Sequence, residues 1–172
     1  MSGEIELFEM GRFQRSTPLA EGVSVYLYRA TVSGLQRNRR LPPGPDGTRR
    51  KPPLPIDLHY LLTAWSSTSV QIQHRLLGWS MRVLADYPIL SAALLNHYSP
   101  GEDDTFADGE TLELSYNPLS LEDMNTVMEP LRPNANASAP YLVRVLYLES
   151  DITLTEAPDV QTRIIELGEM AR

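Results

Sequence analysis

The chain has 172 residues, no cysteine and a formal net charge of −7, with 42% hydrophobic and 22% charged residues. This length and composition are those of a single globular domain, and the lack of cysteine excludes disulfides, thiol nucleophiles and iron–sulfur clusters. No apolar run approaches the roughly 18 residues that cross a bilayer, and the first residues lack the basic and apolar regions of a secretion signal. We therefore expect a cytoplasmic protein that does not bind membranes.

The first third of the chain predicts two long strands joined by an unusual segment. Val23–Val32 is rich in β-branched and aromatic residues, and Ile56–Trp65 alternates apolar with mostly polar positions, so both are predicted strands. Ile5–Phe8 is a shorter candidate strand. Residues 36–55 carry prolines and glycines that disfavour helix and sheet interior, which predicts a long, exposed hairpin loop between the two long strands.

The next part of the chain predicts a helix. Thr68–Gln71 matches a capping box, in which the Thr hydroxyl and the Gln side chain satisfy free amides at a helix start. Apolar spacing then predicts a buried helix face that ends near Asp86, with His74 packed on it. The residues of this predicted face are Val70, His74, Leu77, Met81 and Leu84.

The last part of the chain predicts two further strands and a second main helix. Thr111–Tyr116 and Tyr141–Leu148 are the strands, and Ser120 is a favourable N-cap with acidic residues in the first helical turn. Leu90–Asn96 is a candidate short helix, and Asp159–Leu167 fits either a helix or a strand. The predicted buried face of the second main helix is Leu121, Met124, Met128 and Leu131.

This order of elements predicts an α+β fold formed as one domain over residues 1–172. We expect a mostly antiparallel or mixed sheet with two main helices packed on it. Residues 36–55 form the Pro/Arg-rich hairpin loop of this prediction, and residues 150–172 form a C-terminal extension.

The sequence contains no motif for catalysis, for a cofactor or for a metal. Its three histidines, His59, His74 and His97, lack metal-ligand spacing, and no nucleophile elbow or glycine-rich phosphate loop occurs. We therefore predict no catalytic residue, no cofactor, no metal site and no enzymatic activity. The alternative is an enzyme whose active-site carboxylates are dispersed along the sequence and match no recognised motif.

One segment differs from the acidic remainder of the chain. Between residues 36 and 54, six basic residues against Asp46 give a charge of +5, which leaves −12 for the rest of a chain whose total is −7. The acidic balance and the absence of aromatic residues in this segment argue against nucleic acid as a partner, while guanidinium groups favour carboxylates. We therefore predict a contact with an acidic protein through Arg37, Arg39, Arg40, Arg49, Arg50 and Lys51.

Three stretches read together resemble a known family. They are Gly22–Tyr28, Leu54–Trp65 and His74–Trp79, and the likeness continues through Pro118–Asp123 and Pro140-Tyr141. The pattern resembles the cap, or tail-terminator, proteins of phage-tail-like extracellular contractile injection systems, and it covers most of the chain.

The resemblance implies a tail-terminator-like fold and a structural function. Such a cap is expected to form a homohexameric ring that ends and stabilises the tube and sheath at the distal end of the particle. Its expected partners are further copies of itself and the terminal sheath and inner-tube proteins, with the basic residues at a subunit or sheath interface. The chain departs from many relatives because it starts almost directly with Glu4–Phe8 rather than with an additional helix.

A second hypothesis does not involve an injection particle. The same basic segment would suit a small non-catalytic adaptor domain that binds an acidic protein partner.

Overall fold

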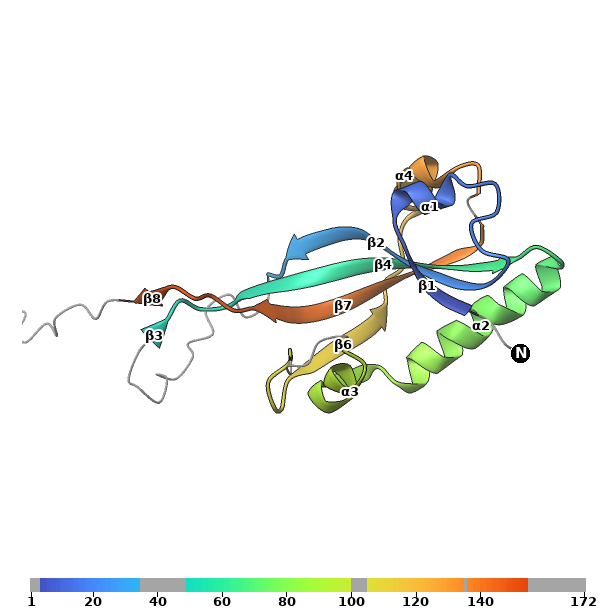
Figure 1. Cartoon of the computed structure of the whole chain (residues 1–172). Helices are drawn as coiled ribbons and strands as arrows, with labels where there is room; N and C mark the ends of the chain where they lie inside the picture. The colour runs from blue at the N-terminus through green and yellow to red at the C-terminus, as the bar shows by residue number, and fades with distance from the viewer. Residues whose placement is uncertain (1–3, 35–48, 100–104, 135, 155–172) are drawn as a thin grey trace, which may run out of the picture.

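The computed structural model describes residues 4–34, 49–99, 105–134 and 136–154, and its centre is one mixed sheet (Figure 1). The strands of this sheet lie in the spatial order β1-β2-β4-β7-β6-β5. A separate two-stranded sheet pairs β3 with β8. The six strands of the main sheet are β1 (Glu4–Phe8), β2 (Glu21–Val32), β4 (Leu54–Ser66), β7 (Ser138–Leu148), β6 (Thr111–Tyr116) and β5 (Ile89–Ser91). The small sheet consists of β3 (Arg49–Arg50) and β8 (Thr153–Leu154).

The strand pairing confirms the predicted α+β class with a mostly antiparallel sheet. Strand β2 runs antiparallel to β4 from the pair Glu21 and Ser66 to the pair Val32 and Ile56. Only β1 pairs in parallel, along the first half of β2. The two predicted hairpin arms are therefore neighbours, as expected, while residues 35–48 of the predicted loop lie outside the described residues.

Helices cover both faces of one half of the sheet (Figure 1). Helix α2 (Val70–Asp86) lies on one face, and α1 (Met10–Phe13), α4 (Leu121–Met128) and the 3-10 turn η1 (Glu129–Leu131) lie on the other. Helix α3 (Ala92–His97) follows β5. Serine side chains accept backbone N–H groups at the starts of α2, α3 and α4, which stabilises each helix end.

Alternation along β4 builds a separate core on each face. Leu61 and Trp65 point towards α1 and α4, where they pack with Phe8, Phe13, Leu19 and Leu131. Leu62 and Ala64 point the other way and pack with Leu76 of α2 and with Val23, Ala139 and Tyr141. Because successive side chains of a strand face opposite sides, β4 must be apolar at nearly every position where helices cover both faces.

The predicted face of α2 is partly wrong. Leu77, Met81 and Leu84 pack on the sheet as expected, but Val70 and His74 are exposed. The fully buried positions of the helix are Gln73, Leu76 and Ser80. Gln73 Nε2 donates to the Ala64 carbonyl at 2.8 Å, so a polar residue occupies a core position that apolar spacing alone assigns elsewhere.

The start of α2 and the buried face of α4 also differ from the sequence prediction. The N-cap of α2 is Ser69 rather than Thr68, because the Ser69 hydroxyl accepts the Gln71 amide at 3.2 Å. In α4 the N-cap is Ser120 as predicted, but Leu121 is fully exposed. Leu121 is the first residue of α4 and does not pack against the sheet, so apolar spacing alone does not identify which residues of the helix are buried.

The Pro-rich segment is shorter than residues 36–55. Arg49 and Arg50 form β3, and Leu54 and Pro55 already belong to β4. Pro55 is fully buried, pairs with Tyr147 of β7, and its carbonyl accepts the Ser33 amide at 2.9 Å. Proline is tolerated here because it stands at the beginning of β4, and its carbonyl still accepts a bond from the chain that continues β2. Of the predicted C-terminal extension, β8 is a strand, and residues 155–172 lie outside the described residues.

We expect Gly22→Ala to separate β1 from β2, because the added Cβ would overlap the backbone carbonyl of Glu4 on the paired strand. Amide hydrogen exchange should accelerate across Glu4–Phe8, and Tm should fall as Phe8 leaves its core. Gly78→Ala in α2 is the matched control: its Cβ meets nothing within 4 Å, so it should stabilise the helix by about 0.5–1 kcal/mol. Unchanged exchange in β1 of Gly22→Ala would contradict this account.

Candidate assembly surfaces

The described residues contain no cluster that could hold a metal. No group of three or more His, Asp or Glu side chains comes together in this part of the chain. His74 is exposed on α2, and His97 is exposed at the end of α3 against the ring of Tyr98. His59 is half-buried in β4, so each histidine has a different neighbourhood.

His59 lines a cavity of about 460 Å³ between the sheet and α4, in which apolar and polar side chains are mixed. Its Nε2 is 3.3 Å from Thr31 Oγ1, and its ring lies 5.9 Å from that of Tyr28. Burial, together with the nearby Arg29 guanidinium, lowers the pKa of His59 below its ordinary value. Burial raises the pKa of Tyr28, so both rings favour their neutral forms. This cavity is built for a neutral, hydrogen-bonded imidazole.

The structure brings the predicted basic residues together only in part. Arg49 and Arg50 form β3, and the Lys51 amide donates to the Ile152 carbonyl at 2.9 Å. Arg50 and Lys51 are exposed. This small sheet lies at the far end of the molecule from α2 (Figure 1). Arg37, Arg39 and Arg40 lie outside the described residues, so only the end of the predicted site has a defined position.

Strands β2, β4 and β7 continue past the helices as an arm, consisting of residues 30–32, 54–58 and 146–148 (Figure 1). The register places Ile56 between Val32 and Leu146, and Leu54 opposite Leu148. Side chains of registered residues share a face, so these positions form one surface of the arm. The arm's apolar face consists of Ala30, Val32, Leu54, Ile56, Leu58, Leu146 and Leu148.

The opposite face of the arm is more polar, so the arm is an amphipathic sheet. It carries the pair of Thr31 and Asp57 beside the pair of Pro55 and Tyr147, and Arg29 pairs with His59 where the arm meets α4. Yet Val32 and Leu54 remain 46% exposed, and Leu148 remains 48% exposed. Contiguous exposed apolar side chains of this kind mark a candidate interaction surface. Alternation in the sequence indicates such a face, but it does not indicate whether the same chain covers it.

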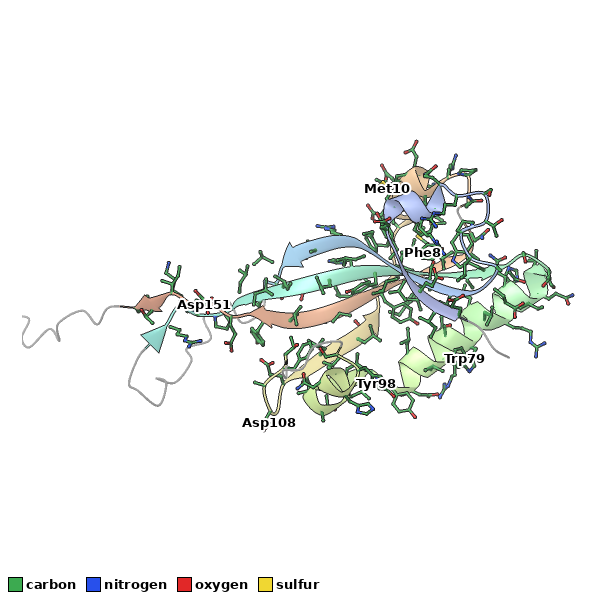
Figure 2. All side chains as sticks on the ribbon, viewed as in Figure 1. Phe8, Met10, Trp79, Tyr98, Asp108 and Asp151 are labelled. Carbon is green, nitrogen blue, oxygen red and sulfur yellow. The ribbon has the colours of Figure 1, made fainter. Side chains whose placement is uncertain are left out.

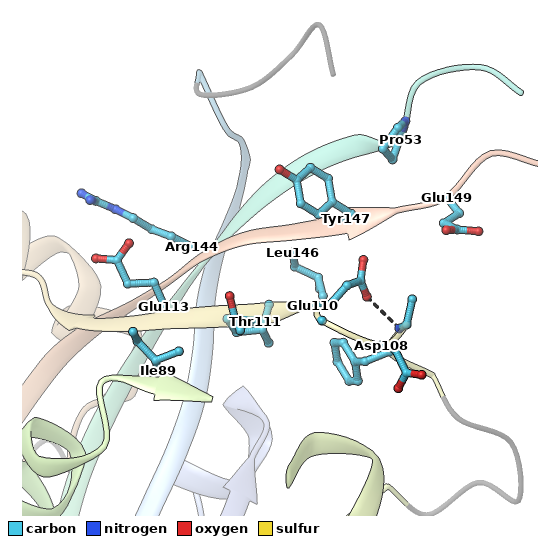
Figure 3. A pocket seen from close by; sticks show the side chains of 14 residues that line it. Pro53, Ile89, Asp108, Glu110, Thr111, Glu113, Arg144, Leu146, Tyr147 and Glu149 are labelled. Atoms are coloured by element: carbon cyan, nitrogen blue, oxygen red, sulfur yellow. Dashed lines mark hydrogen bonds between the residues drawn. The ribbon is translucent and has the colours of Figure 1, made fainter. Parts of the chain in front are cut away.

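A groove of about 560 Å³ runs beside the arm, along β6 and the end of β7 (Figure 3). Its lining is rich in carboxylates, and the groove holds a single arginine, Arg144, which is the register partner of Glu113. The Glu110 carboxylate accepts the Ala107 amide at 3.0 Å, which fixes the loop that leads into β6. The acidic residues of the groove are Asp108, Glu110, Glu113 and Glu149. An excess of negative charge in a groove favours a basic segment as its occupant.

Two solved structures with a similar fold are terminators of contractile injection systems or related particles. A sheath/tube terminator of an extracellular contractile injection system, PVC in its extended state, matches with a TM-score of 0.58 at 16% identity. The alignment covers 98% of this chain and 57% of that chain. The tube-terminating cap of the anti-feeding prophage matches with a TM-score of 0.50 at 17% identity over 88% of this chain and 50% of that one. The fold is therefore a tube-terminator fold, and the chain spans little more than half the length of these proteins.

The family follows from the sequence itself. Residues 2–162 match the model of the Pvc16 N-terminal domain, and the chain belongs to this family. The resemblance to cap and tail-terminator proteins is thereby confirmed. No curated protein matches the chain. None of the helices in the described ranges has the length and hydropathy that a bilayer crossing requires.

We expect the free energy of unfolding to fall as the pH is lowered from about 7.5 to 5.5, partly through His59. Its pKa in the folded chain lies below the ordinary value of 6.5, so between the two values the unfolded chain binds more protons. His59 therefore contributes stability above pH 6.5 that is lost as the pH falls towards the folded-state pKa.

His59→Gln should flatten this pH dependence, which urea unfolding at a series of pH values would measure. His97→Gln, at an exposed position, is the control and should keep the slope of the wild type. Equal slopes for the wild type and His59→Gln would show that burial does not oppose protonation of this imidazole.

Proposed function

We propose that this chain is a structural cap, or tail terminator, of a contractile injection system. Its match to the Pvc16 N-terminal domain family over residues 2–162 carries this proposal. The cap would form a ring of six copies that ends and stabilises the tube and sheath at the distal end. Its partners would be further copies of itself and the terminal sheath and inner-tube proteins, assembled in the cytoplasm without enzymatic activity.

The amphipathic arm supports an assembly function. Within the described residues, the apolar face stays exposed at Val32, Leu54 and Leu148, and a closed ring covers surfaces of this kind on every subunit. A ring needs two different surfaces that fit each other, because each subunit meets the next in a head-to-tail manner. The basic segment at Arg49–Lys51 and the acidic groove beside β6 are two such surfaces.

We propose further that the basic segment of one copy contacts the acidic groove of the next. The charges are of opposite sign, and arginine forms paired hydrogen bonds with carboxylates. The adaptor alternative uses the same basic segment, but it leaves the acidic groove and the apolar face of the arm without a role. Size separates the two functions, since six copies of a 19.3 kDa chain weigh about 116 kDa.

Electron microscopy of particles from cells that lack this gene is the direct test of the cap function. We expect open distal ends, variable lengths or spontaneous contraction, because nothing would stop elongation or hold the last sheath layer. Complementation with Val32→Lys should fail to restore capped particles, since a charge would interrupt the apolar face of the arm.

Thr31→Lys is the matched control for that variant. It places the same side chain on the adjacent residue, which pairs with Asp57 on the polar face, and it should restore capping. Particles of uniform length with closed ends in the absence of the gene would overturn the cap function.

Reversal of Arg49, Arg50 and Lys51 to Glu should weaken ring assembly while the monomer stays folded, because like charges would then meet across the interface. Analytical ultracentrifugation or mass photometry at increasing protein concentration would measure the loss. Adding Asp108→Lys and Glu149→Lys to the same chain should restore assembly, since the attraction is then re-formed with the signs exchanged. Assembly that is indifferent to all of these charges would exclude this interface.

A further inference from the structure

Strand β1 is an open edge of the main sheet. In the part of the chain that the structure describes, β1 is an end strand that pairs with β2 alone. Its five residues, Glu4–Phe8, therefore present backbone donors and acceptors on the side away from β2. Such an edge is a template for one more strand.

The side chains of β1 make this edge unusually receptive. Ile5 is 68% exposed and Leu7 is 83% exposed, although proteins commonly protect edge strands with charged residues or proline. The parallel register sets Ile5 beside Val23 and Leu7 beside Val25. Both residues therefore lie on the sheet face that carries α2.

On that face an apolar groove of about 280 Å³ runs between the sheet and α2. Ile5 lines it from β1, and Trp79 and Val83 line it from α2. Trp79 is 56% exposed, and Figure 2 shows it on the part of the helix that lies near β1. An added strand would extend the apolar lining over Ile5, Leu7 and Trp79, where a single chain leaves it open to water.

The other side of β1 carries an excess of carboxylates over guanidinium groups, because Glu4, Glu6 and Glu9 lie there with Arg12 and Arg15, and this excess favours a basic partner. Glu6 forms an ion pair with Arg12 at 3.0 Å. Glu4, and Glu9 directly after the strand, are exposed. A second copy that paired β1 with β1 would bring these glutamates close to one another, which like-charge repulsion opposes. A strand that alternates apolar residues with lysine or arginine fits both sides of the edge.

We propose that β1 is a docking edge for an extended segment of a partner protein in which apolar and basic residues alternate. The segment adds a strand to the sheet through main-chain hydrogen bonds. Its apolar side chains cover Ile5, Leu7 and Trp79, and its basic side chains lie beside the glutamates. This interaction is separate from the contacts of the arm, so it holds or fails independently of the cap function.

The test uses the full chain and a synthetic peptide of eight alternating valine and lysine residues. The chain has two tryptophans, and Trp65 is buried at 3% exposure with its indole N–H donated to Ser24 at 2.8 Å. Peptide binding should therefore shift the fluorescence of Trp79 to shorter wavelength in a saturable manner. Amide exchange should slow across Glu4–Phe8 when the peptide is present.

Two further peptides distinguish strand addition from nonspecific binding. A peptide with N-methyl groups on every residue cannot donate main-chain hydrogen bonds along either edge, and a valine–glutamate peptide reverses the charge. Each should bind at least about tenfold more weakly than the valine–lysine peptide. Equal affinity of the N-methylated peptide, or tighter binding of the glutamate peptide, would overturn the proposal.

Variants of the chain then locate the edge. Leu7→Lys should weaken binding by about tenfold or more without unfolding the protein, because this side chain is almost fully exposed. Ile89→Lys is the matched control, since Ile89 is an exposed apolar residue on β5, the end strand at the opposite edge of the sheet. No binding of the valine–lysine peptide, or loss of binding in Ile89→Lys rather than in Leu7→Lys, would overturn the proposal.

Discussion

The fold depends above all on the pairing of β2 with β4, because β4 divides its side chains between two cores. Leu61 and Trp65 serve one core, and Leu62 and Ala64 serve the other, so a slip of the register by one residue would exchange the two sets. Polar contacts fix the register from within. The Trp65 indole donates to the Ser24 hydroxyl at 2.8 Å, and the Thr63 hydroxyl lies 2.7 Å from that of Ser138 on β7. These two hydrogen bonds hold β2, β4 and β7 in one register.

The same pairing that builds the cores also produces the arm. Strands β2, β4 and β7 extend beyond the helices that cover them, and their pairing continues past the register shifts between Leu27 and Arg29 and between Ile56 and Leu58. Where helices lie on both faces, β4 is apolar at successive positions, and where they end, one face becomes polar while the other stays apolar. The change in pattern along one strand thus separates a part that stabilises the monomer from a part that is available to a neighbour.

Much of the sheet could be predicted from the sequence, because β-branched runs with period two have few other interpretations. The buried face of α2 was harder to predict. Gln73 is buried there with its side-chain amide bonded to the Ala64 carbonyl, and apolar spacing does not identify a polar residue in the core. The parallel direction of β1 and the register shifts between Leu27 and Arg29 follow from tertiary contacts. Of the candidate site, the basic residues are visible in the sequence, but the acidic groove forms only when residues 106–113 fold beside the end of β7.

Charge and apolar surface have different tasks in the proposed assembly. An apolar face such as that of the arm attracts without regard to orientation, so by itself it would join copies in several ways. A net charge of −7 makes copies repel one another in most orientations. The orientation that brings Arg49–Lys51 to the acidic groove of a neighbour is the one in which this repulsion turns into attraction. In this proposal the apolar face supplies binding energy only in the head-to-tail arrangement that closes a ring, so the two surfaces together would define one assembly.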